Sequence, residues 1–457
     1  MQFFRGDPTQ TISLSYIPPR DTEDIFVNEP KKRRGIGPAI FVTAAFIGPG
    51  TVMTASKAGA TFGYTLLWAI LFSVVAAIVL QEMAARLGIV TGKGLTEAIR
   101  STVQNRTLRF MLLGLVLLGI LFGNSAYQTG NILGAASGLE ILSSGNGETN
   151  DSFLGSITMW SIVIATCAIA VIWIGRFDFL QVLLVFLVAT MGLLFLLAAI
   201  ALGPNWQQLF TGFIPTFPQG DPSSSGLNEI WLVIGLIGTT VVPYNLFLHA
   251  SSAAARWPNR DETARSVRQS LWDTIISVSL GGVITASLLV TAAIAFGDGS
   301  QLKKVADIAS QLRPLLGNWA EFGFGVGILA AGLTSSITAP IAAGFATAGC
   351  FGKDASLSSP FLKWVATAVV LAGLGCAILF GSSPSEAIIV AQIANGLLLP
   401  IIAIFLLVIV NRSQLMEKMV NGWLANLLGI SIVILTALMA ARQFDMVIGK
   451  LKALVGF

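Results

Sequence analysis

The chain has 457 residues, of which 54% are hydrophobic and 11% are charged, and its formal net charge at pH 7 is +4. Soluble domains carry roughly 25% charged residues, so this composition excludes an ordinary soluble protein. Apolar runs near the roughly 20 residues that cross a bilayer recur along the whole sequence and predict a polytopic membrane protein. The small positive charge is typical of membrane proteins, and no nucleic-acid partner is expected.

The chain starts with a polar segment, residues 1–34, which contains prolines, ends in KKRR and lacks the apolar core of a secretory signal. This segment predicts a mobile cytoplasmic tail. From residue 35 onward, apolar stretches separated by charged or Gly/Pro-rich breaks predict eleven transmembrane spans. Their expected limits are 36–59, 63–88, 110–140, 154–175, 178–203, 228–253, 270–296, 321–350, 361–381, 386–411 and 420–441.

The distribution of basic residues predicts the orientation in the membrane. The loops after the second and sixth predicted spans are rich in arginine and fall on the same side as KKRR. The opposite side receives the acidic stretch GNGETND at 145–151 and the polar loop 218–229. Lysine and arginine accumulate on the cytoplasmic side of membranes. We therefore expect a multi-pass protein of the cell membrane, embedded in the lipid bilayer, with a cytoplasmic N-terminus and an extracytoplasmic C-terminus.

Two of the predicted spans are interrupted near their middle by proline. The first contains Gly48-Pro49-Gly50, and the sixth is interrupted around Pro243, within 239–245. Proline removes a backbone donor and clashes with the preceding turn. Unpaired backbone at this depth is tolerated only where it faces protein or a watery cavity. A simple proline kink explains either break alone, but two breaks at matching positions indicate a functional site.

The matching positions also predict how the chain is organised. Each break lies in the first span of a block of five spans, and an odd number of spans gives the two blocks opposite orientations. Corresponding broken helices in two inverted halves point to the central site of a transporter. The expected parts are the tail 1–34, a first repeat 35–203, an extracellular loop 204–227, a second repeat 228–411, and a last span with the C-terminal segment 412–457.

Several stretches resemble the Nramp metal-ion transporters. They are GPAIFVTAAFIGPGTVMTASKAGATFGY from residue 37, ARLGIVTGK at 85–93, IGLIGTTVVPYNLFLHASS at 234–252 and LAAGLTSSITAPIAAGF at 329–345. The resemblance runs from about Gly35 to the tenth predicted span. It implies an all-α LeuT-type fold with 11 transmembrane helices, in which two inverted five-helix repeats with broken helices 1 and 6 are followed by one further helix.

The chain departs from this family at the breaks. The resemblance implies Asp-Pro-Gly-Asn in the first break and Met-Pro-His in the sixth span, where this sequence has Gly-Pro-Gly-Thr and Val-Pro-Tyr. A carboxylate, an amide and a soft thioether ligand are thereby lost, and a backbone carbonyl at the position of Thr239 remains available. The candidate substrate-binding residues are Gly48, Gly50, Thr51, Thr239, Val242, Tyr244 and Asn245, with Pro49 and Pro243 as the helix breakers.

The implied proton route is altered as well. Third-span acids of the family match Gln128 and Asn131, and Asn395 lies near the family's polar residue of the tenth span. We expect these three amides to line the cavity.

Three ionisable side chains within the spans are candidates for gating or coupling. They are Lys57, His249 and Asp273. Lys57 replaces a neutral residue of the family and either faces the site or extends outward to the interface. A structural role is the alternative for His249, and a salt bridge with the arginine-rich loop is the alternative for Asp273.

These substitutions shape the expected function. A dehydrated divalent cation near the membrane centre needs negative ligands, so proton-coupled Mn²⁺ or Fe²⁺ uptake is not expected and no metal site is assigned. We expect alternating-access transport, with a weakly bound hydrated cation such as Mg²⁺ as the candidate substrate. The alternative is a small organic solute, such as an amino acid or carboxylate, held by the amides of the broken helices. A non-transporting receptor on the same fold is a third, less favoured class. We expect no enzymatic activity and no cofactor, because no nucleophile–base pair or metal-ligand cluster is apparent.

Overall fold

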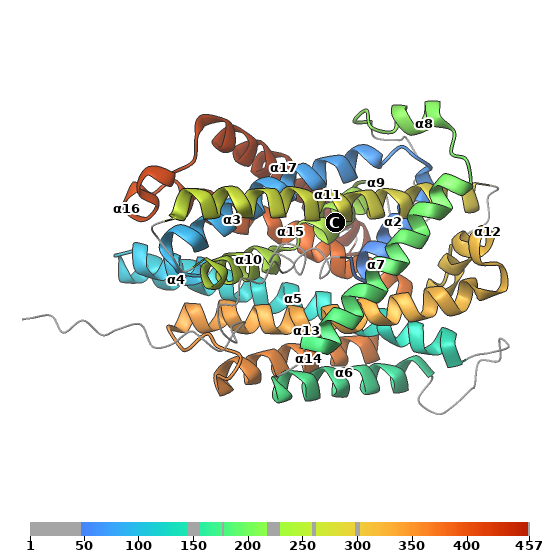
Figure 1. The fold of residues 1–457 in the computed structure, drawn as a ribbon, viewed down its shortest axis with the longest axis horizontal. Coiled ribbons are helices and arrows are strands. Elements are labelled where there is room, and N and C mark those ends of the chain that lie inside the picture. The colour runs from blue at the N-terminus through green and yellow to red at the C-terminus, as the bar shows by residue number, and fades with distance from the viewer. Residues whose placement is uncertain are drawn as a thin grey trace, which may run out of the picture.

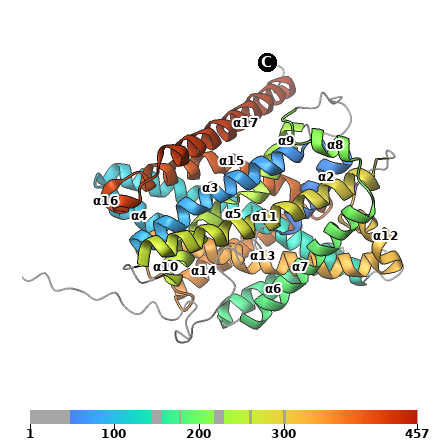
Figure 2. The ribbon, with the colours of Figure 1, turned by 45° about the horizontal axis from the view of Figure 1, so that its top comes forward.

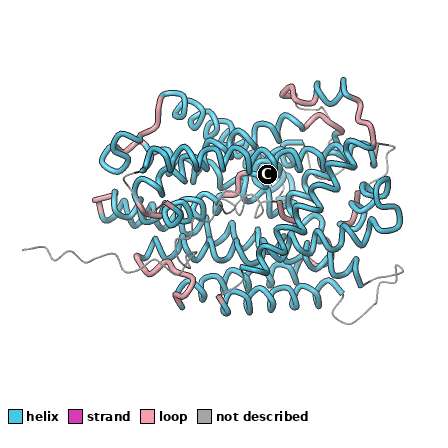
Figure 3. Tube along the Cα trace, in the orientation of Figure 1, coloured by secondary structure: helices cyan, strands magenta, loops and turns pink. Residues whose placement is uncertain are grey.

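The computed structural model describes residues 47–143, 156–175, 178–216, 229–257, 262–297 and 302–455. Within these ranges every regular element is a helix, and turns and loops connect the helices (Figure 3). Ten helical segments in the described ranges are long and apolar enough to cross a membrane. The expectation of an all-α polytopic membrane protein is confirmed.

The helices of the first half end before the predicted extracellular loop. They are α2 (Pro49–Phe62), α3 (Leu67–Thr91), α4 (Leu95–Thr102), α5 (Arg106–Ser143), α6 (Ser156–Ile174) and α7 (Asp178–Ala201), followed by the short α8 (Trp206–Thr211).

The second half begins with a helix in two pieces. Its elements are α9 (Glu229–Thr240), α10 (Pro243–Arg256), α11 (Thr263–Ala295), η2 (Val305–Leu312), α12 (Arg313–Leu316), η3 (Gly317–Trp319), α13 (Ala320–Phe351), α14 (Pro360–Leu379) and α15 (Pro384–Val410). The chain then forms α16 (Ser413–Met416), η4 (Glu417–Met419) and α17 (Trp423–Val455).

The observed helices follow the predicted spans closely, with two differences. The first predicted span lies outside the described residues up to residue 46, and α2 covers the part that follows its break. The last predicted span ends at residue 441, whereas α17 continues to Val455. The part of α17 that is apolar enough to cross a membrane is Trp423–Ala441, which agrees with the predicted end of this span at residue 441.

The two ends of the molecule are built from different elements. The short α4 and α16 and the far end of α10 gather at one end, whereas α8 and α12 lie at the other (Figure 1). Between them α5 packs against α13, α14 and α15, which all come from the second half of the chain. The last helix, α17, lies along one side, where it contacts α15 and α3 (Figure 2). The interior is therefore an interface between the two halves.

Glycine allows two pairs of helices to approach very closely. A Cβ atom added to Gly88 of α3 would overlap with the carbonyl oxygen of Ala250 in α10. A Cβ atom added to Gly59 of α2 would likewise overlap with the carbonyl oxygen of Leu289 in α11. Small residues of this kind are typical of helix contacts in membranes, where van der Waals packing drives association.

The close contact at Gly88 predicts a large effect of substitution. We expect Gly88→Val to destabilise the protein by about 2 kcal/mol, because overpacking a well-packed contact costs about 1–3 kcal/mol. Thermal unfolding of the purified protein in detergent measures this. The matched control is Gly114→Val on α5, where an added Cβ meets no atom within 4 Å. Equal unfolding temperatures for the two variants would contradict the predicted contact.

Candidate functional site

The first break is built by Gly48 and Pro49. Helix α2 begins at Pro49, and Gly48 precedes it with an extended backbone, at φ −101° and ψ −177°. No side chain caps this helix start. The first turn is closed by the Val52 amide, which donates to the Gly48 carbonyl at 3.2 Å. The amides ahead of it point out of the helix, as the first N–H groups of an α-helix do.

The second break separates α9 from α10 over only two residues, Val241 and Val242. Helix α10 begins at Pro243, Val242 has φ −75° and ψ 122°, and again no side chain caps the helix start. The Asn245 amide donates to the Val242 carbonyl at 3.0 Å, so this amide is less available than the sequence suggested. Each second half-helix thus starts with proline and presents the partial positive charge of a helix N-terminus.

A hydrogen bond joins the two breaks directly. The Oγ1 atoms of Thr51 in α2 and Thr239 in α9 lie 2.6 Å apart, and both residues are buried. These residues are separated by 188 positions in the sequence. The structure therefore brings together the two interrupted helices that the sequence predicted to form one site.

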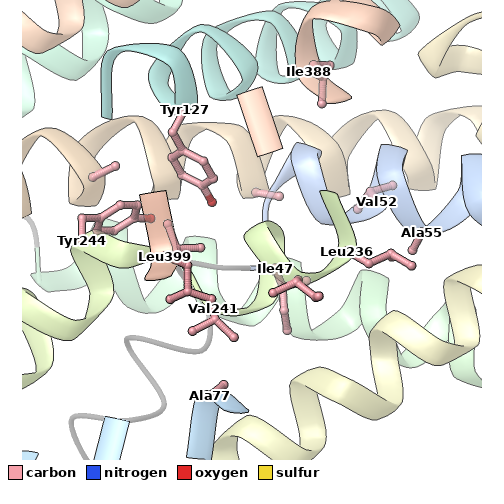
Figure 4. Packing of buried hydrophobic residues seen from close by; sticks show 14 of the residues in the cluster. Ile47, Val52, Ala55, Ala77, Tyr127, Leu236, Val241, Tyr244, Ile388 and Leu399 are labelled. Atoms are coloured by element: carbon pink, nitrogen blue, oxygen red, sulfur yellow. The ribbon is translucent and has the colours of Figure 1, made fainter. Parts of the chain in front are cut away.

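Polar side chains of α5 and α13 surround the position of Gly48. A Cβ atom built on Gly48 would lie 3.0 Å from Ser335 Oγ, 3.3 Å from Tyr127 Oη and 3.7 Å from Asn131 Oδ1. Figure 4 shows Tyr127 and Tyr244 near each other beside Ile47 and Val241, and their ring centroids are 5.3 Å apart. Sequence reasoning had missed Tyr127, although it precedes the predicted Asn131 by one helical turn.

Gln392 is a second residue that sequence reasoning missed. Its side chain lies directly over Gly50, where an added Cβ atom would overlap with the amide group. Gln392 is buried, and neither of its amide atoms has a hydrogen-bond partner. The predicted Asn395 lies three residues further along α15, and residues at this spacing share a helix face. That spacing is the signal by which Gln392 could have been found.

The other predicted polar residues lie in different surroundings. Gln128 contacts α13 and α14 instead of the break, because its Nε2 donates to the Ser336 carbonyl at 3.2 Å and its stem packs on Gly373. Asn395 faces α5, with its Oδ1 atom 3.6 Å from the position of a Cβ on Gly123.

The three candidates for gating or coupling lie on three different helices. Lys57 in α2 donates from Nζ to the Leu302 carbonyl at 3.1 Å, just before η2. The Lys57 ammonium therefore lies at the segment that leads into η2, and η2 packs against α12. His249 is buried in α10 and neither ring nitrogen has a hydrogen-bond partner, whereas Asp273 in α11 is half-buried.

Neutral groups dominate the buried polar atoms around the breaks. In the described residues, Asn131, Asn245 and Gln392 each bury both amide atoms without a hydrogen-bond partner. An unpaired buried polar group costs about 1–3 kcal/mol unless water or another molecule supplies the missing hydrogen bond. No group of three or more His, Cys, Asp or Glu side chains that could hold a metal occurs in the described part of the chain.

Comparison with solved structures identifies the fold. The crystal structure of the Eremococcus coleocola manganese transporter superimposes with a TM-score of 0.74 at 24% sequence identity, over 92% of this chain and 90% of that chain. The inward-facing structure of Mhp1 gives a TM-score of 0.53 at 14% identity, over 91% and 92% of the two chains. These similarities, together with the paired breaks, identify the fold as the LeuT type.

Sequence comparison identifies the family within this class. The family model described as natural resistance-associated macrophage protein-like matches residues 39–444. The divalent metal cation transporter MntH of Ralstonia nicotianae is 30% identical over 401 residues, 87% of each chain. MntH 1 of Pseudomonas aeruginosa is 32% identical over 315 residues, 67% of each chain. This chain belongs to the Nramp family, and the resemblance seen in the sequence is confirmed.

The contact between Gly50 and Gln392 predicts that a larger residue at position 50 destabilises the protein and that a smaller one at position 392 relieves the loss. We expect Gly50→Ala to lower the unfolding temperature, because the added methyl group displaces the Gln392 amide at a cost of about 1–3 kcal/mol. This cost outweighs the gain of up to about 1 kcal/mol from replacing glycine in a helix. Combining Gly50→Ala with Gln392→Ala should recover much of the lost stability.

Thermal unfolding of the two single variants and the double variant measures the coupling, which should reach at least 0.5 kcal/mol for residues in contact. Additive effects of the two substitutions would show that the side chains do not meet.

Proposed function

We propose that this chain is an Nramp-family alternating-access transporter whose central site binds a hydrated divalent cation such as Mg²⁺, and that it does not run proton-coupled uptake of Mn²⁺ or Fe²⁺. Relatives such as the Ralstonia nicotianae protein are named divalent metal cation transporters, which supports a divalent cation as the substrate. The proposed site lies between the two breaks and the facing surfaces of α5, α13 and α15. Its substrate-binding residues are Gly48, Gly50, Thr51, Thr239, Val242, Tyr244 and Asn245, extended by Tyr127, Asn131 and Gln392.

The observation that carries this proposal is the neutral character of the groups at the breaks. Gly48 stands where the family places an aspartate, and its neighbours are the hydroxyls of Ser335 and Tyr127 and the amide of Asn131. A bare divalent ion buried among such groups keeps its full charge uncompensated, at a cost of many kcal/mol. Mg²⁺ dehydrates reluctantly and is usually bound with several of its waters. Amide and hydroxyl oxygens suit such a hydrated ion, since they accept hydrogen bonds from its waters.

The same argument applies to protons. Gln128 and Asn131 occupy the α5 positions where the resemblance implies acids. An amide side chain does not take up and release a proton during a transport cycle as a carboxylate can. The coupling candidates that remain are Lys57, His249 and Asp273. Of these, the Lys57 ammonium is already held by the Leu302 carbonyl near the end of the molecule, away from the breaks.

A second candidate function is uptake of a small organic solute with a carboxylate. The observation in its favour is that neither Gly48 nor Val242 caps its helix with a side chain and neither first turn holds an acidic residue, so both helix N-termini lack a neutralising anion of their own. Helix N-termini attract carboxylates through their amides and their dipoles. The position of Lys57 does not add to this attraction.

The substrate is tested by titration calorimetry and proteoliposome uptake with Mg²⁺, Mn²⁺ and a panel of amino acids and carboxylates. We expect weak Mg²⁺ binding and flux and no saturable Mn²⁺ binding by the unmodified protein. Gly48→Asp should gain saturable Mn²⁺ binding, at least tenfold tighter than any residual binding by the unmodified protein, because it places a carboxylate beside Tyr127 and Asn131. The asparagine of Gly48→Asn has nearly the same shape as aspartate but no charge, so this variant should show no saturable Mn²⁺ binding.

Other outcomes separate the proposals. Saturable Mn²⁺ uptake by the unmodified protein would overturn the argument from neutral ligands. Binding of an organic anion with no response to Mg²⁺ would favour the second candidate function.

Coupling is tested separately, by imposing an inward proton gradient on the proteoliposomes. We expect uptake to change by less than twofold, in the unmodified protein and in His249→Gln alike, because the α5 amides do not titrate. An acceleration that is present in the unmodified protein and lost in His249→Gln would instead assign proton coupling to this histidine.

A further inference from the structure

An open cavity lies apart from the breaks, where the end of α4, the start of α5 and the end of α13 meet. Its volume is about 420 Å³. Three arginines line it, Arg100 from α4 and Arg106 and Arg109 from α5. Phe110, Leu113 and Cys350 supply apolar walls. The cavity therefore combines a concentrated positive charge with an apolar surface.

The three guanidinium groups have no carboxylate partner in the described residues. The salt bridges among the described residues are those of Arg86 with Glu82, Arg265 with Glu262 and Arg313 with Glu321. Two carboxylates stand near in the sequence, but each has another partner. Glu97 accepts a hydrogen bond from the Gly94 amide at 3.2 Å, and Asp354 accepts one from the Ser356 hydroxyl at 2.9 Å. Neither carboxylate forms an ion pair with the three arginines in the described part of the chain.

Large apolar side chains stand beside the arginines. Phe110 is 79% exposed and Met111 is 64% exposed, one turn into the membrane-spanning helix α5. The cavity lies at the end of the molecule where α4 and α16 gather (Figure 1). The positive-inside rule assigns this end to the cytoplasm, where the membrane leaflet carries anionic lipids. The arginines are therefore at headgroup level, and the exposed apolar residues face the acyl chains.

We propose that this cavity binds the phosphate of an anionic phospholipid headgroup from the cytoplasmic leaflet. Guanidinium groups bind phosphate oxygens through paired, charge-assisted hydrogen bonds, and three of them converge on one small volume. The adjacent Phe110 and Met111 give the acyl chains a surface to pack on, which a free phosphate would not use. A bound lipid would bridge α4 and α5 to the end of α13.

The test measures lipid binding by the full-length protein, purified and delipidated in detergent. Phosphatidylglycerol and phosphatidylcholine are added in parallel, and bound lipid is counted by native mass spectrometry while the unfolding temperature is followed. We expect phosphatidylglycerol to bind and raise the unfolding temperature, with phosphatidylcholine weaker by at least tenfold. The double variant Arg106→Gln/Arg109→Gln should lose this preference.

The matched control is Arg265→Gln/Arg268→Gln, which removes the same charge from exposed positions at the start of α11, outside the cavity. It should bind phosphatidylglycerol as the unmodified protein does. Ser101→Glu keeps every arginine but adds a carboxylate to the cavity wall, and it should also lose the preference.

Three results would overturn the proposal. The first is an equal loss of the phosphatidylglycerol preference in the α11 control, which would show that the preference depends only on the protein's net charge. The second is unchanged lipid preference in Ser101→Glu. The third is an equal rise in unfolding temperature with inorganic phosphate alone, which would identify a site for a soluble anion. None of these readouts depends on the transported substrate.

Discussion

The architecture depends on one constraint, which is that backbone N–H and C=O groups inside a bilayer must find partners within the protein. Two prolines, Pro49 and Pro243, violate the simplest solution, a continuous helix, at corresponding points of the two halves. The chain satisfies the constraint by surrounding both breaks with other helices. Thr51 bonds to Thr239 across the breaks, and α5, α13 and α15 close around them with hydroxyl and amide side chains. The site is thus a consequence of burying interrupted backbone.

Charge distinguishes this site from an ordinary cation site. Hydroxyls and amides bind as dipoles, so they stabilise a ligand without demanding a particular sign of charge. Asn131 and Gln392 each offer a donor and an acceptor, and neither is committed to another residue of the described chain. Such a lining discriminates by hydrogen bonding and size more than by charge. This favours ligands that keep a shell of water or carry their own polar groups over bare ions.

Much of this arrangement could be predicted from the sequence, because it follows from residues with local effects. Proline marked both breaks, with flanking glycines in the first, and the span limits followed from hydropathy to within a few residues for most helices. Tyr127 and Gln392 were missed because their positions relative to the breaks depend on which face of α5 and α15 meets them, and hydropathy is nearly uniform around both helices. The direction of Lys57 was left open for a related reason, since its partner Leu302 lies 245 residues away.

The bond between Thr51 and Thr239 has a consequence for affinity. The two hydroxyls satisfy each other at 2.6 Å, so any ligand that needs their oxygens must first separate or reorient the pair. A neutral hydrogen bond of this kind contributes about 1 kcal/mol net. Since 1.4 kcal/mol corresponds to a tenfold change in affinity, the pair weakens every such ligand by about fivefold. A ligand held by these oxygens would therefore compete with a contact of the protein itself, one that joins α2 to α9.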